Sequence, residues 1–201
     1  MTTTTIDGLL YRRMLTGAAQ SLQNKKEEIN SLNVFPVPDG DTGTNMFMTI
    51  DAVRTVDRSG ISHLGRYAEL SAKDMMRAAR GNSGVILSLF FRGVAKAFAE
   101  HESADARLLL SAFRTGAEEA RKYRVRKETE EARKTAEAVG GKTLKLTAKS
   151  GQGGKLFGSI TSAMVQAELS KQGVEIEKKK IDVPTHAIKM TGTYEVRVHL
   201  Y

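Results

Sequence analysis

The sequence predicts a multidomain protein: an all-α antiparallel helical segment, then a long connecting helix, then a small α+β domain. Three observations predict this order. Apolar residues recur at helical spacing through the first half of the chain. A strongly charged stretch with few large apolar positions follows, ARKYRVRKETEEARKTAEAV. After Gly140 and Gly141 the pattern changes to short runs in which apolar and polar residues alternate.

Helical spacing defines the elements of the first part. The first helix is expected from Ile6 to Leu32, because apolar residues there fall on one face: Ile6, Leu9, Leu10, Met14, Ala18, Leu22 and Ile29. Further helices are expected over residues 45–56, 67–79 and 83–99, with a loop over 58–64. Residues 105–138 predict one long helix or two in line, and the charged later half is typical of an exposed connector.

The last part predicts short strands around one helix. We expect a strand over residues 143–148, a glycine-rich loop over 150–159, and a helix from Thr161 to Gln172 that ends at Gly173. Residues 174–183 and 193–201 alternate as strands do. In the final run one face is expected to be apolar and the other polar, with Tyr194, Val196, Val198 and Leu200 opposite Glu195, Arg197 and His199.

Charge is distributed unevenly along the chain. Residues 1–120 contain 14 Lys plus Arg and 14 Asp plus Glu, whereas residues 121–201 contain 17 and 9. The whole net charge of +8 therefore lies in the last part. This asymmetry indicates an anionic partner for that part, nucleic acid being the commonest, and a lysine-rich surface that serves solubility is the alternative.

Other features of the sequence bear on location. The chain has no cysteine, which excludes disulfides and thiol chemistry and fits a reducing compartment. The N-terminus, MTTTTIDGLLYRRML, lacks the basic and apolar segments of a secretory signal. The apolar stretch around residues 85–94 is too short to span a bilayer. We expect a cytoplasmic protein of 201 residues with no membrane span.

The most informative motif is NVFPVPDGDTGTNM, residues 33–46. A tight turn at Gly40 can aim Asp39 and Asp41 at one point, and hard oxygen ligands suit Mg²⁺. Gly43 lets the backbone approach an anion closely. Hydroxyls and amides at the start of the following helix can receive phosphate oxygens. Ordinary turn chemistry is the alternative, because Asp and Gly dominate turns for conformational reasons alone.

A second loop, RGNSG at residues 80–84, favours the phosphate interpretation. It lies between two helical patterns and again offers glycines, a hydroxyl and a carboxamide, now with a cation. Two such loops separated by helices can converge on one ligand.

On NVFPVPDGDTGTNM and ARGNSGVILSLFFRG, residues 6–122 resemble the nucleotide-binding, DhaL-like domain of dihydroxyacetone kinase, in the version found in bacterial fatty acid kinase. The resemblance implies a partial DhaL-like helical barrel, since the family's barrel continues for several more helices. It also implies paired Mg²⁺ ions and ATP or ADP as cofactors, and a glycerone (dihydroxyacetone) or fatty acid kinase activity.

The resemblance also implies site residues. Asp39 and Asp41 become metal ligands, and Asn33 stands near a position where the dihydroxyacetone branch has a further Asp. The nucleotide phosphates would meet Thr42, Gly43, Thr44, Asn45, Met46, Gly81, Asn82, Ser83 and Gly84. No side chain is assigned a catalytic role, because the metal neutralises charge and the protein mainly positions the transferred group. The family's acceptor comes on a separate protein, which implies an acceptor-presenting partner.

The third motif is SGQGGKLFGSITS, residues 150–162. It is no P-loop, because Leu156 follows Gly154 and Lys155. Lysines, amides and the aromatic ring of Phe157 suit RNA backbone and loop bases. A core position is the commoner role for such a phenylalanine.

On GKTLKLTAKSGQGGKLFGSITS, VEIEKKKIDVP and GTYEVRVHLY, residues 141–201 resemble the C-terminal domain of bacterial ribosomal large-subunit protein nine. The charged helix before them is similar to that protein's connecting helix. The resemblance implies ribosomal RNA as the partner, although the family's N-terminal RNA-binding domain is replaced by the kinase-like segment. The candidate RNA contacts are Lys149, Gln152, Lys155, Lys178, Lys179 and Lys180.

The expected domains are residues 1–122, the connector 123–140, and residues 141–201. Three hypotheses stay open. The chain is a Mg-ATP-binding kinase-like domain fused to an rRNA-binding domain, or an rRNA-binding protein without kinase activity, or a natural or constructed fusion of two truncated genes that retains neither activity. Helical faces that a partial barrel leaves exposed would allow a homodimer.

Overall fold

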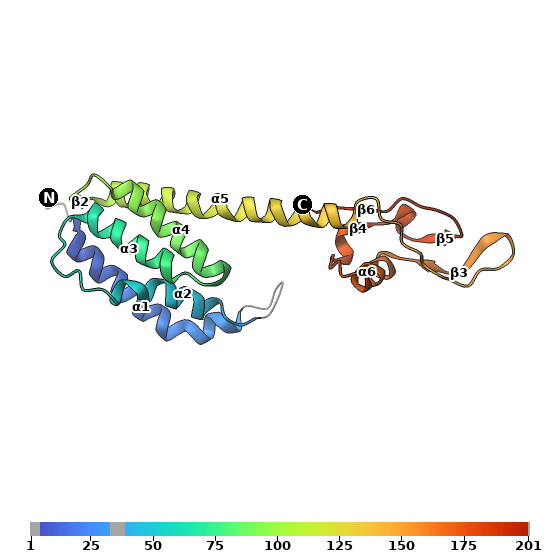
Figure 1. The fold of residues 1–201 in the computed structure, drawn as a ribbon, viewed down its shortest axis with the longest axis horizontal. Helices are drawn as coiled ribbons and strands as arrows, with labels where there is room; N and C mark the ends of the chain where they lie inside the picture. Colours follow the sequence, from blue (N-terminus) through green and yellow to red (C-terminus); the bar gives the residue numbers. More distant parts are fainter. Residues whose placement is uncertain (1–4, 33–38, 201) are drawn as a thin grey trace. The chain divides into compact units, whose positions relative to one another are not determined.

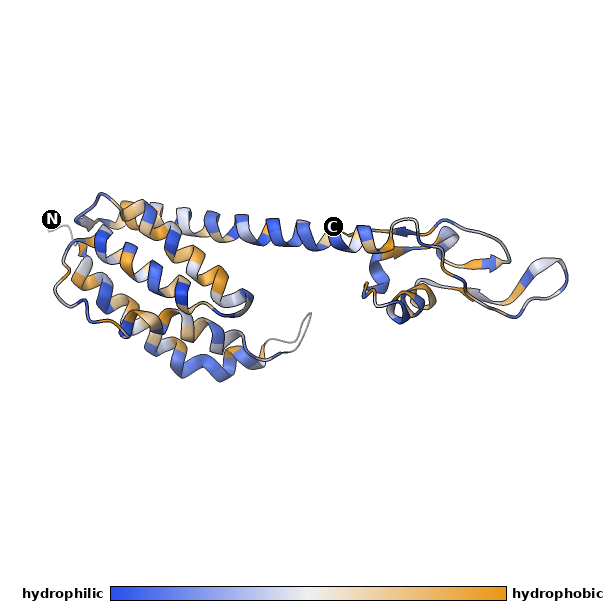
Figure 2. Cartoon of the chain, in the orientation of Figure 1, coloured by the Kyte–Doolittle hydropathy of each residue, from blue (hydrophilic) through white to orange (hydrophobic). Residues whose placement is uncertain are grey.

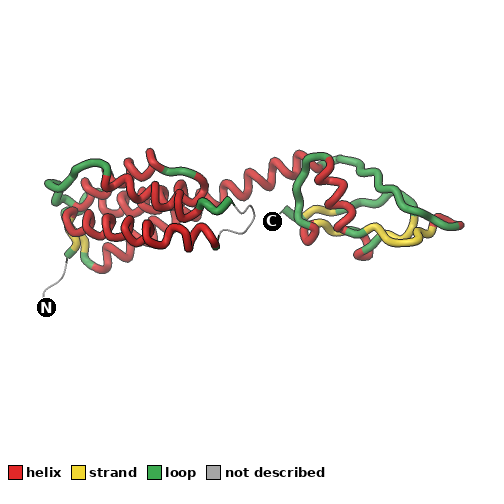
Figure 3. Tube along the Cα trace, turned by 90° about the horizontal axis from the view of Figure 1, so that it is seen from below, coloured by secondary structure: helices red, strands yellow, loops and turns green. Residues whose placement is uncertain are grey.

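The computed structural model describes residues 5–32 and 39–200 of the chain. It divides into two compact units, residues 1–126 and 127–201. The first unit is helical, and most of the short strands belong to the second (Figures 1 and 3). This is the predicted multidomain fold, in which a helical part precedes a small α+β part.

The helical unit begins with β1, whose two residues pair with β2 near the start of α5. Its elements are β1 (Ile6–Asp7), α1 (Gly8–Ser31), α2 (Thr42–Asp51), a 3₁₀ turn (Ala52–Arg54), α3 (Leu64–Ala78), α4 (Gly81–Phe98), β2 (Ser103–Ala104) and the start of α5 (Ala106–Val139). β1 pairs antiparallel with β2. The predicted helices are confirmed within a few residues, and residues 105–138 form one helix instead of two in line.

The core of the helical unit is built around three aromatic side chains. Tyr11 of α1 contacts Tyr67 of α3 and Phe98 of α4, with ring centroids 6.2 and 5.6 Å apart and rings nearly perpendicular. Edge-to-face pairs of this kind add to the free energy of simple burial. Burial of Tyr11, more than the neighbouring Tyr67, raises the pKa of its phenol. These contacts hold α1, α3 and α4 together.

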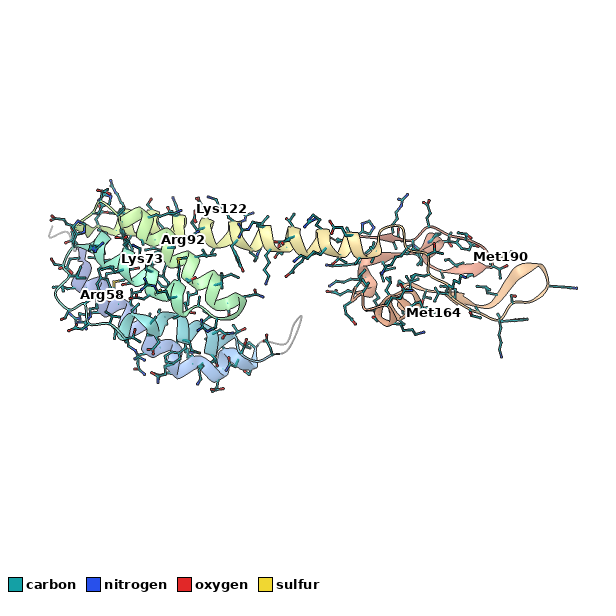
Figure 4. All side chains as sticks on the ribbon, viewed as in Figure 1. Arg58, Lys73, Arg92, Lys122, Met164 and Met190 are labelled. Atoms are coloured by element: carbon teal, nitrogen blue, oxygen red, sulfur yellow. The ribbon has the colours of Figure 1, made fainter. Side chains whose placement is uncertain are left out.

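Two glycines let α4 and α5 cross closely. A Cβ atom built on Gly93 would lie 2.7 Å from Cα of Gly116, so neither position accepts a larger side chain without moving a helix. Glu119 of α5 also joins the two helices, because it accepts a hydrogen bond from Arg92 of α4 at 2.9 Å and pairs with Lys96 of α4 at 3.3 Å. Figure 4 labels Arg92 and Lys122, and Lys122 also pairs with Glu119 at 3.7 Å.

The later part of α5 is mostly hydrophilic on the side seen in Figure 2. Among the residues of α5, only Ala112 and Gly116 are buried, and both lie in its first half. The prediction of a charged, exposed helix is confirmed. Within residues 5–32 and 39–200, no helix is both long and apolar enough to cross a membrane.

The second unit packs short strands around one helix. Its elements are a 3₁₀ turn (Gln152–Gly154), β3 (Lys155–Ile160), α6 (Ser162–Lys171), a 3₁₀ turn (Lys178–Lys180), β4 (Ile181–Asp182), a 3₁₀ turn (Pro184–His186), β5 (Ile188–Met190) and β6 (Arg197–Val198). β3 pairs antiparallel with β5, and β4 with β6. The buried core residues are Ile160, Val165, Leu169, Val174, Ile176, Ile181 and Val183.

One strand prediction and one loop prediction in this unit are wrong. Residues 143–148 form no strand, and the predicted loop at 150–159 contains most of β3. Leu144 and Leu146 nevertheless pack against the core. The alternating apolar residues of this segment therefore indicated which side chains are buried, although the segment forms no strand hydrogen bonds. In the last run Val196 and Val198 also pack inward as predicted, whereas Tyr194 is exposed.

Candidate functional site

The predicted acidic turn leads directly into α2. Gly40 adopts φ +62°, the left-handed region that favours glycine, and Asp39 and Asp41 on either side of it are exposed. The third predicted metal ligand, Asn33, lies outside the described residues. The turn therefore presents two carboxylates at the N-terminus of a helix.

Asp41 occupies the position before α2 without capping it. Its side chain accepts no cap hydrogen bond, and its main chain has φ −114° and ψ 1°. By contrast, Asp7 accepts from the amide of Leu10 at 2.8 Å, and Asp105 accepts from that of Leu108 at 2.8 Å. Capping is the usual structural role of Asp at this position, and the Asp41 side chain does not perform it.

Asn30, near the end of α1, holds the first turn of α2 in place. Its carboxamide oxygen accepts from the amide of Thr44 at 3.1 Å, and its Nδ2 donates to Oγ1 of Thr44 at 3.0 Å. The Thr44 hydroxyl thus accepts from Asn30 and is left to donate its own proton. Sequence reasoning missed Asn30, since it lies outside the motif and acts through the packing of α1 on α2.

Gly43 is buried between α1 and α2. A Cβ atom built on it would lie 2.3 Å from the carbonyl oxygen of Lys26, 3.0 Å from Cβ of Ile29 and 3.1 Å from Oδ1 of Asn30. Real Cβ atoms do not approach a backbone oxygen so closely. Besides the anion approach expected from the sequence, Gly43 therefore lets the two helices come close enough for Asn30 to reach Thr44.

The first turn of α4 lies against the first turn of α2. A Cβ atom on Gly81, which has φ +59°, would lie 2.5 Å from Nδ2 of Asn45, and one on Gly84 would lie 2.6 Å from Oγ1 of Thr49. The hydroxyl of Ser83 donates to the carbonyl oxygen of Thr42 at 3.5 Å. The two predicted loops therefore converge, although Thr42 and Ser83 are 41 residues apart.

Two adjacent helix N-termini contribute partial positive charge to this edge of the unit, beside the carboxylates of Asp39 and Asp41. Each helix contributes about half a unit of positive charge at its first turn. Asn45 and Gly84 are buried beneath the edge, while Gly81, Asn82 and the cationic Arg80 are exposed, and Met46 is half-buried. The main-chain amides of Thr44 and Asn45 already have acceptors, Asn30 and Asp41.

The donors at this edge are hard oxygen atoms. In the described part of the chain, no group of three or more His, Cys, Asp and Glu side chains could hold a metal ion. A cage of protein ligands for Ca²⁺ or Zn²⁺ is therefore not seen there. Mg²⁺ commonly takes one or two carboxylates and completes its shell with water and substrate phosphates, which fits Asp39 and Asp41.

A separate shallow pocket of about 420 Å³ opens between α2 and α3. Its lining includes Asp74 and Arg77 of α3, and Asp74 also pairs with Arg58. None of the predicted metal or phosphate residues lines it. The complete lining is Phe47, Met48, Asp51, Ala52, Thr55, Asp74, Arg77 and Ala78.

The RNA candidates of the second unit fall into two places. Lys149, Gln152 and Lys155 are exposed around a tight hairpin whose tip is the 3₁₀ turn at residues 152–154. Phe157 follows on β3 with 80% of its surface exposed, so the expected core position is wrong.

The second place is the 3₁₀ turn of Lys178, Lys179 and Lys180, which leads into β4. Its surroundings carry both signs of charge. Lys179 pairs with Glu177 at 2.6 Å, and this hydrogen bond lowers the pKa of the Glu177 carboxyl. The three lysines therefore form a less purely cationic surface than their sequence implies.

Comparison with known proteins divides the chain in the same way. Residues 36–135 match the DAK2 domain, and residues 130–201 match the C-terminal domain of ribosomal protein L9. An uncharacterized protein of Staphylococcus saprophyticus is 42% identical over 118 residues, which are 58% of this chain and 21% of that protein. An uncharacterized protein of Staphylococcus aureus strain USA300 is also 42% identical over 118 residues, 58% of this chain and 22% of that protein.

The chain spans about a fifth of the length of these curated relatives. The two domain matches meet within α5, at residues 130–135. Both resemblances read from the motifs are confirmed by these matches. The chain therefore joins a segment that matches the DAK2 domain to a segment that matches the ribosomal protein L9 C-terminal domain.

Proposed function

We propose that the helical unit binds Mg-ATP or Mg-ADP at the joined N-termini of α2 and α4, as a kinase-like phosphoryl-transfer domain of the fatty acid or dihydroxyacetone kinase type. The second unit would bind ribosomal RNA. The single observation that carries the nucleotide site is Asp41, which stands at the cap position of α2 with its carboxylate exposed and unused by the helix. The match to the DAK2 domain supports the same site.

The side chains divide the task as follows. Asp39 and Asp41 would hold Mg²⁺, which when bound neutralises charge on the phosphates. Thr44, oriented by Asn30, would donate its hydroxyl proton to a phosphate oxygen. Gly81, Asn82 and Ser83 would place the second helix N-terminus against the same phosphate group. None of these residues forms a covalent bond, which agrees with catalysis by positioning and charge.

Transfer also needs an acceptor. The proposed partner is a protein that presents a fatty acid or dihydroxyacetone, since the site itself offers only phosphate and metal ligands. We also propose self-association through exposed apolar side chains of the helical unit. Leu110 and Phe113 of α5 are 54% and 42% exposed. Sedimentation velocity measures this directly.

Calorimetric titration of ATP with and without Mg²⁺ tests the nucleotide site. The full chain should bind ATP only with the metal, and Asp39→Asn and Asp41→Asn should each weaken binding at least about tenfold, because each removes a charged ligand of a hard cation. Asp57→Asn is the matched control. Asp57 is exposed on the same unit, and its carboxylate accepts a hydrogen bond from the amide of Ser59.

Two results would contradict the proposal. One is the absence of any ATP binding by a chain whose circular dichroism shows folded helices. The other is an equal loss of ATP binding in the Asp57→Asn control, because the weaker binding would then follow from the change in net charge and not from the loss of a metal ligand. In either case the chain would retain the second unit as its candidate for function.

The charge of the second part favours the other candidate, an RNA-binding protein without kinase activity. All of the net charge of +8 lies in residues 121–201, and residues 130–201 match the ribosomal protein L9 C-terminal domain. Binding of ribosomal RNA fragments by the full chain, with no binding of Mg-ATP, would select this candidate.

A further inference from the structure

Residues 149–157 form a tight hairpin with one face toward the core of the unit and one exposed face. Ser150 pairs with Leu156, the amide of Phe157 donates to the carbonyl oxygen of Lys149 at 3.0 Å, and that of Gly151 donates to Lys155 at 2.8 Å. Leu156 packs on the core of the unit. Since side chains alternate along paired strands, Lys149, Lys155 and Phe157 share the opposite, outer face.

The ring of Phe157 lies over Gly151 on that face. A Cβ atom built on Gly151 would lie 3.1 Å from Cζ of Phe157, so the glycine makes room for the ring. With 80% of its surface exposed, Phe157 is the most exposed of the large apolar residues of the described chain. The ring therefore rests on backbone and leaves its other side open.

The face is extended by β5. Lys155 pairs with Met190, which is labelled in Figure 4 and is 46% exposed, and the amide of Thr191 donates to Gly154 at 2.8 Å. Lys189, also exposed, lies next to Met190 on β5. An exposed aromatic ring thus lies on one face with Lys149 and Lys155, and Met190 extends this face on β5.

The two chain segments that form this surface contain no acidic residue. The sequence has no Asp or Glu between Glu137 and Glu168, nor between Asp182 and Glu195. The lysines of these two segments are Lys142, Lys145, Lys149, Lys155 and Lys189. The acidic residues of the unit lie on α5 and α6, around the triple lysine turn, where Glu177 pairs with Lys179, and before β6.

We propose that Phe157 is a stacking platform for an unpaired base of single-stranded RNA, with Lys149 and Lys155 contacting the phosphates on either side. An exposed ring within a cationic face is how proteins bind single strands, because every base has a π face while lysines follow the backbone. The proposal deepens the RNA-binding part of the proposed function and rests on it. It assigns single-strand recognition to this hairpin and not to Lys178, Lys179 and Lys180.

Fluorescence anisotropy with the full chain tests it, using labelled oligouridine of twelve nucleotides and an RNA duplex of the same length. Phe157→Ala should weaken single-strand binding by roughly 5- to 150-fold, the usual range for one stacked base, and change duplex binding by less than about twofold. Phe157→Trp should restore binding. Because the chain has no tryptophan, quenching of the new indole by the oligonucleotide would report stacking directly.

The lysines are tested by the salt dependence of binding. Lys149→Gln with Lys155→Gln should reduce the salt slope by about 1 to 2, since each lysine neutralises one phosphate, whereas Phe157→Ala should leave the slope unchanged. The control replaces Lys178, Lys179 and Lys180 by Gln. It should keep the preference for the single strand.

The outcomes separate the platform from RNA binding in general. If Phe157→Ala binds the single strand like the unchanged chain, or the tryptophan is not quenched, the platform is wrong while RNA binding stands. If the unchanged chain binds neither RNA, both the platform and the RNA part of the proposed function fail.

Discussion

Replacement of Gly43 by alanine should destabilise the helical unit, although alanine normally strengthens a helix. The added methyl group would lie 2.3 Å from the carbonyl oxygen of Lys26, a backbone atom that moves only with α1. Separation of α1 from α2 would also stretch the two hydrogen bonds between Asn30 and Thr44. The substitution thus acts on packing and on the proposed phosphate site together.

The magnitude follows from three contributions. Overpacking of a close contact costs about 1–3 kcal/mol. Weakening of the Asn30 bonds costs about 0.5–1.5 kcal/mol more. Alanine in place of glycine inside a helix contributes about 0.5–1 kcal/mol in the opposite direction. The three ranges combine to a net destabilisation of about 0.5–4 kcal/mol, centred on about 2 kcal/mol.

Gly17→Ala is the matched control. Gly17 is an exposed residue of α1, and a Cβ atom built on it meets nothing within 4 Å. The same substitution should therefore stabilise the unit by about 0.5–1 kcal/mol. Urea unfolding followed by far-ultraviolet circular dichroism should show the midpoint of Gly43→Ala lowered by roughly 0.5–2 M and that of Gly17→Ala raised. Stabilisation by both substitutions would refute the close packing of α1 on α2.

Two further predictions concern single side chains. Asn30→Ala should weaken Mg-ATP binding severalfold with the helical content unchanged, because Thr44 loses its orienting partner, and Asn24→Ala, an exposed position on the same helix, should not. If both variants bind equally well, Asn30 has no positioning role. Hydrogen bonds from Arg92 and then Lys96 lower the pKa of the Glu119 carboxyl from 4.5. The stabilisation from Glu119 is therefore present above the unfolded-state pKa and is lost as the pH falls through the lower folded-state pKa. Glu119→Gln should lower the melting temperature at neutral pH, and this difference should shrink at acidic pH. An equal difference at both pH values would contradict this.

The convergence of the two N-terminal loops was predictable, since both motifs precede helices and carry the same kinds of side chain. The structure brings Ser83 to Thr42 as that reasoning expects. The role of Asn30 was not predictable, because it depends on how α1 crosses α2. Likewise Gly43 was expected to approach an anion, and its contact with Lys26 emerges only from the packing.

In the second unit, the alternation of apolar residues predicted which side chains are buried better than it predicted where the strands lie. Leu144 and Leu146 pack inward as the alternation indicates, but no neighbouring segment of the described chain forms a ladder with them. The glycines of residues 150–159 signalled a loop, whereas Leu156 and Ile160 drive β3 onto the core. Phe157 then faces outward because it is adjacent to Leu156, a consequence of strand alternation that a loop assignment cannot give.

The most direct test of the proposed nucleotide site is to locate Mg-ADP on the chain by nuclear magnetic resonance. The largest changes in amide chemical shift are expected together at residues 39–45 and 81–84, the joined first turns of α2 and α4. These changes are expected only when Mg²⁺ is present. Changes confined to the pocket between α2 and α3, or identical changes without the metal, would contradict the proposed site.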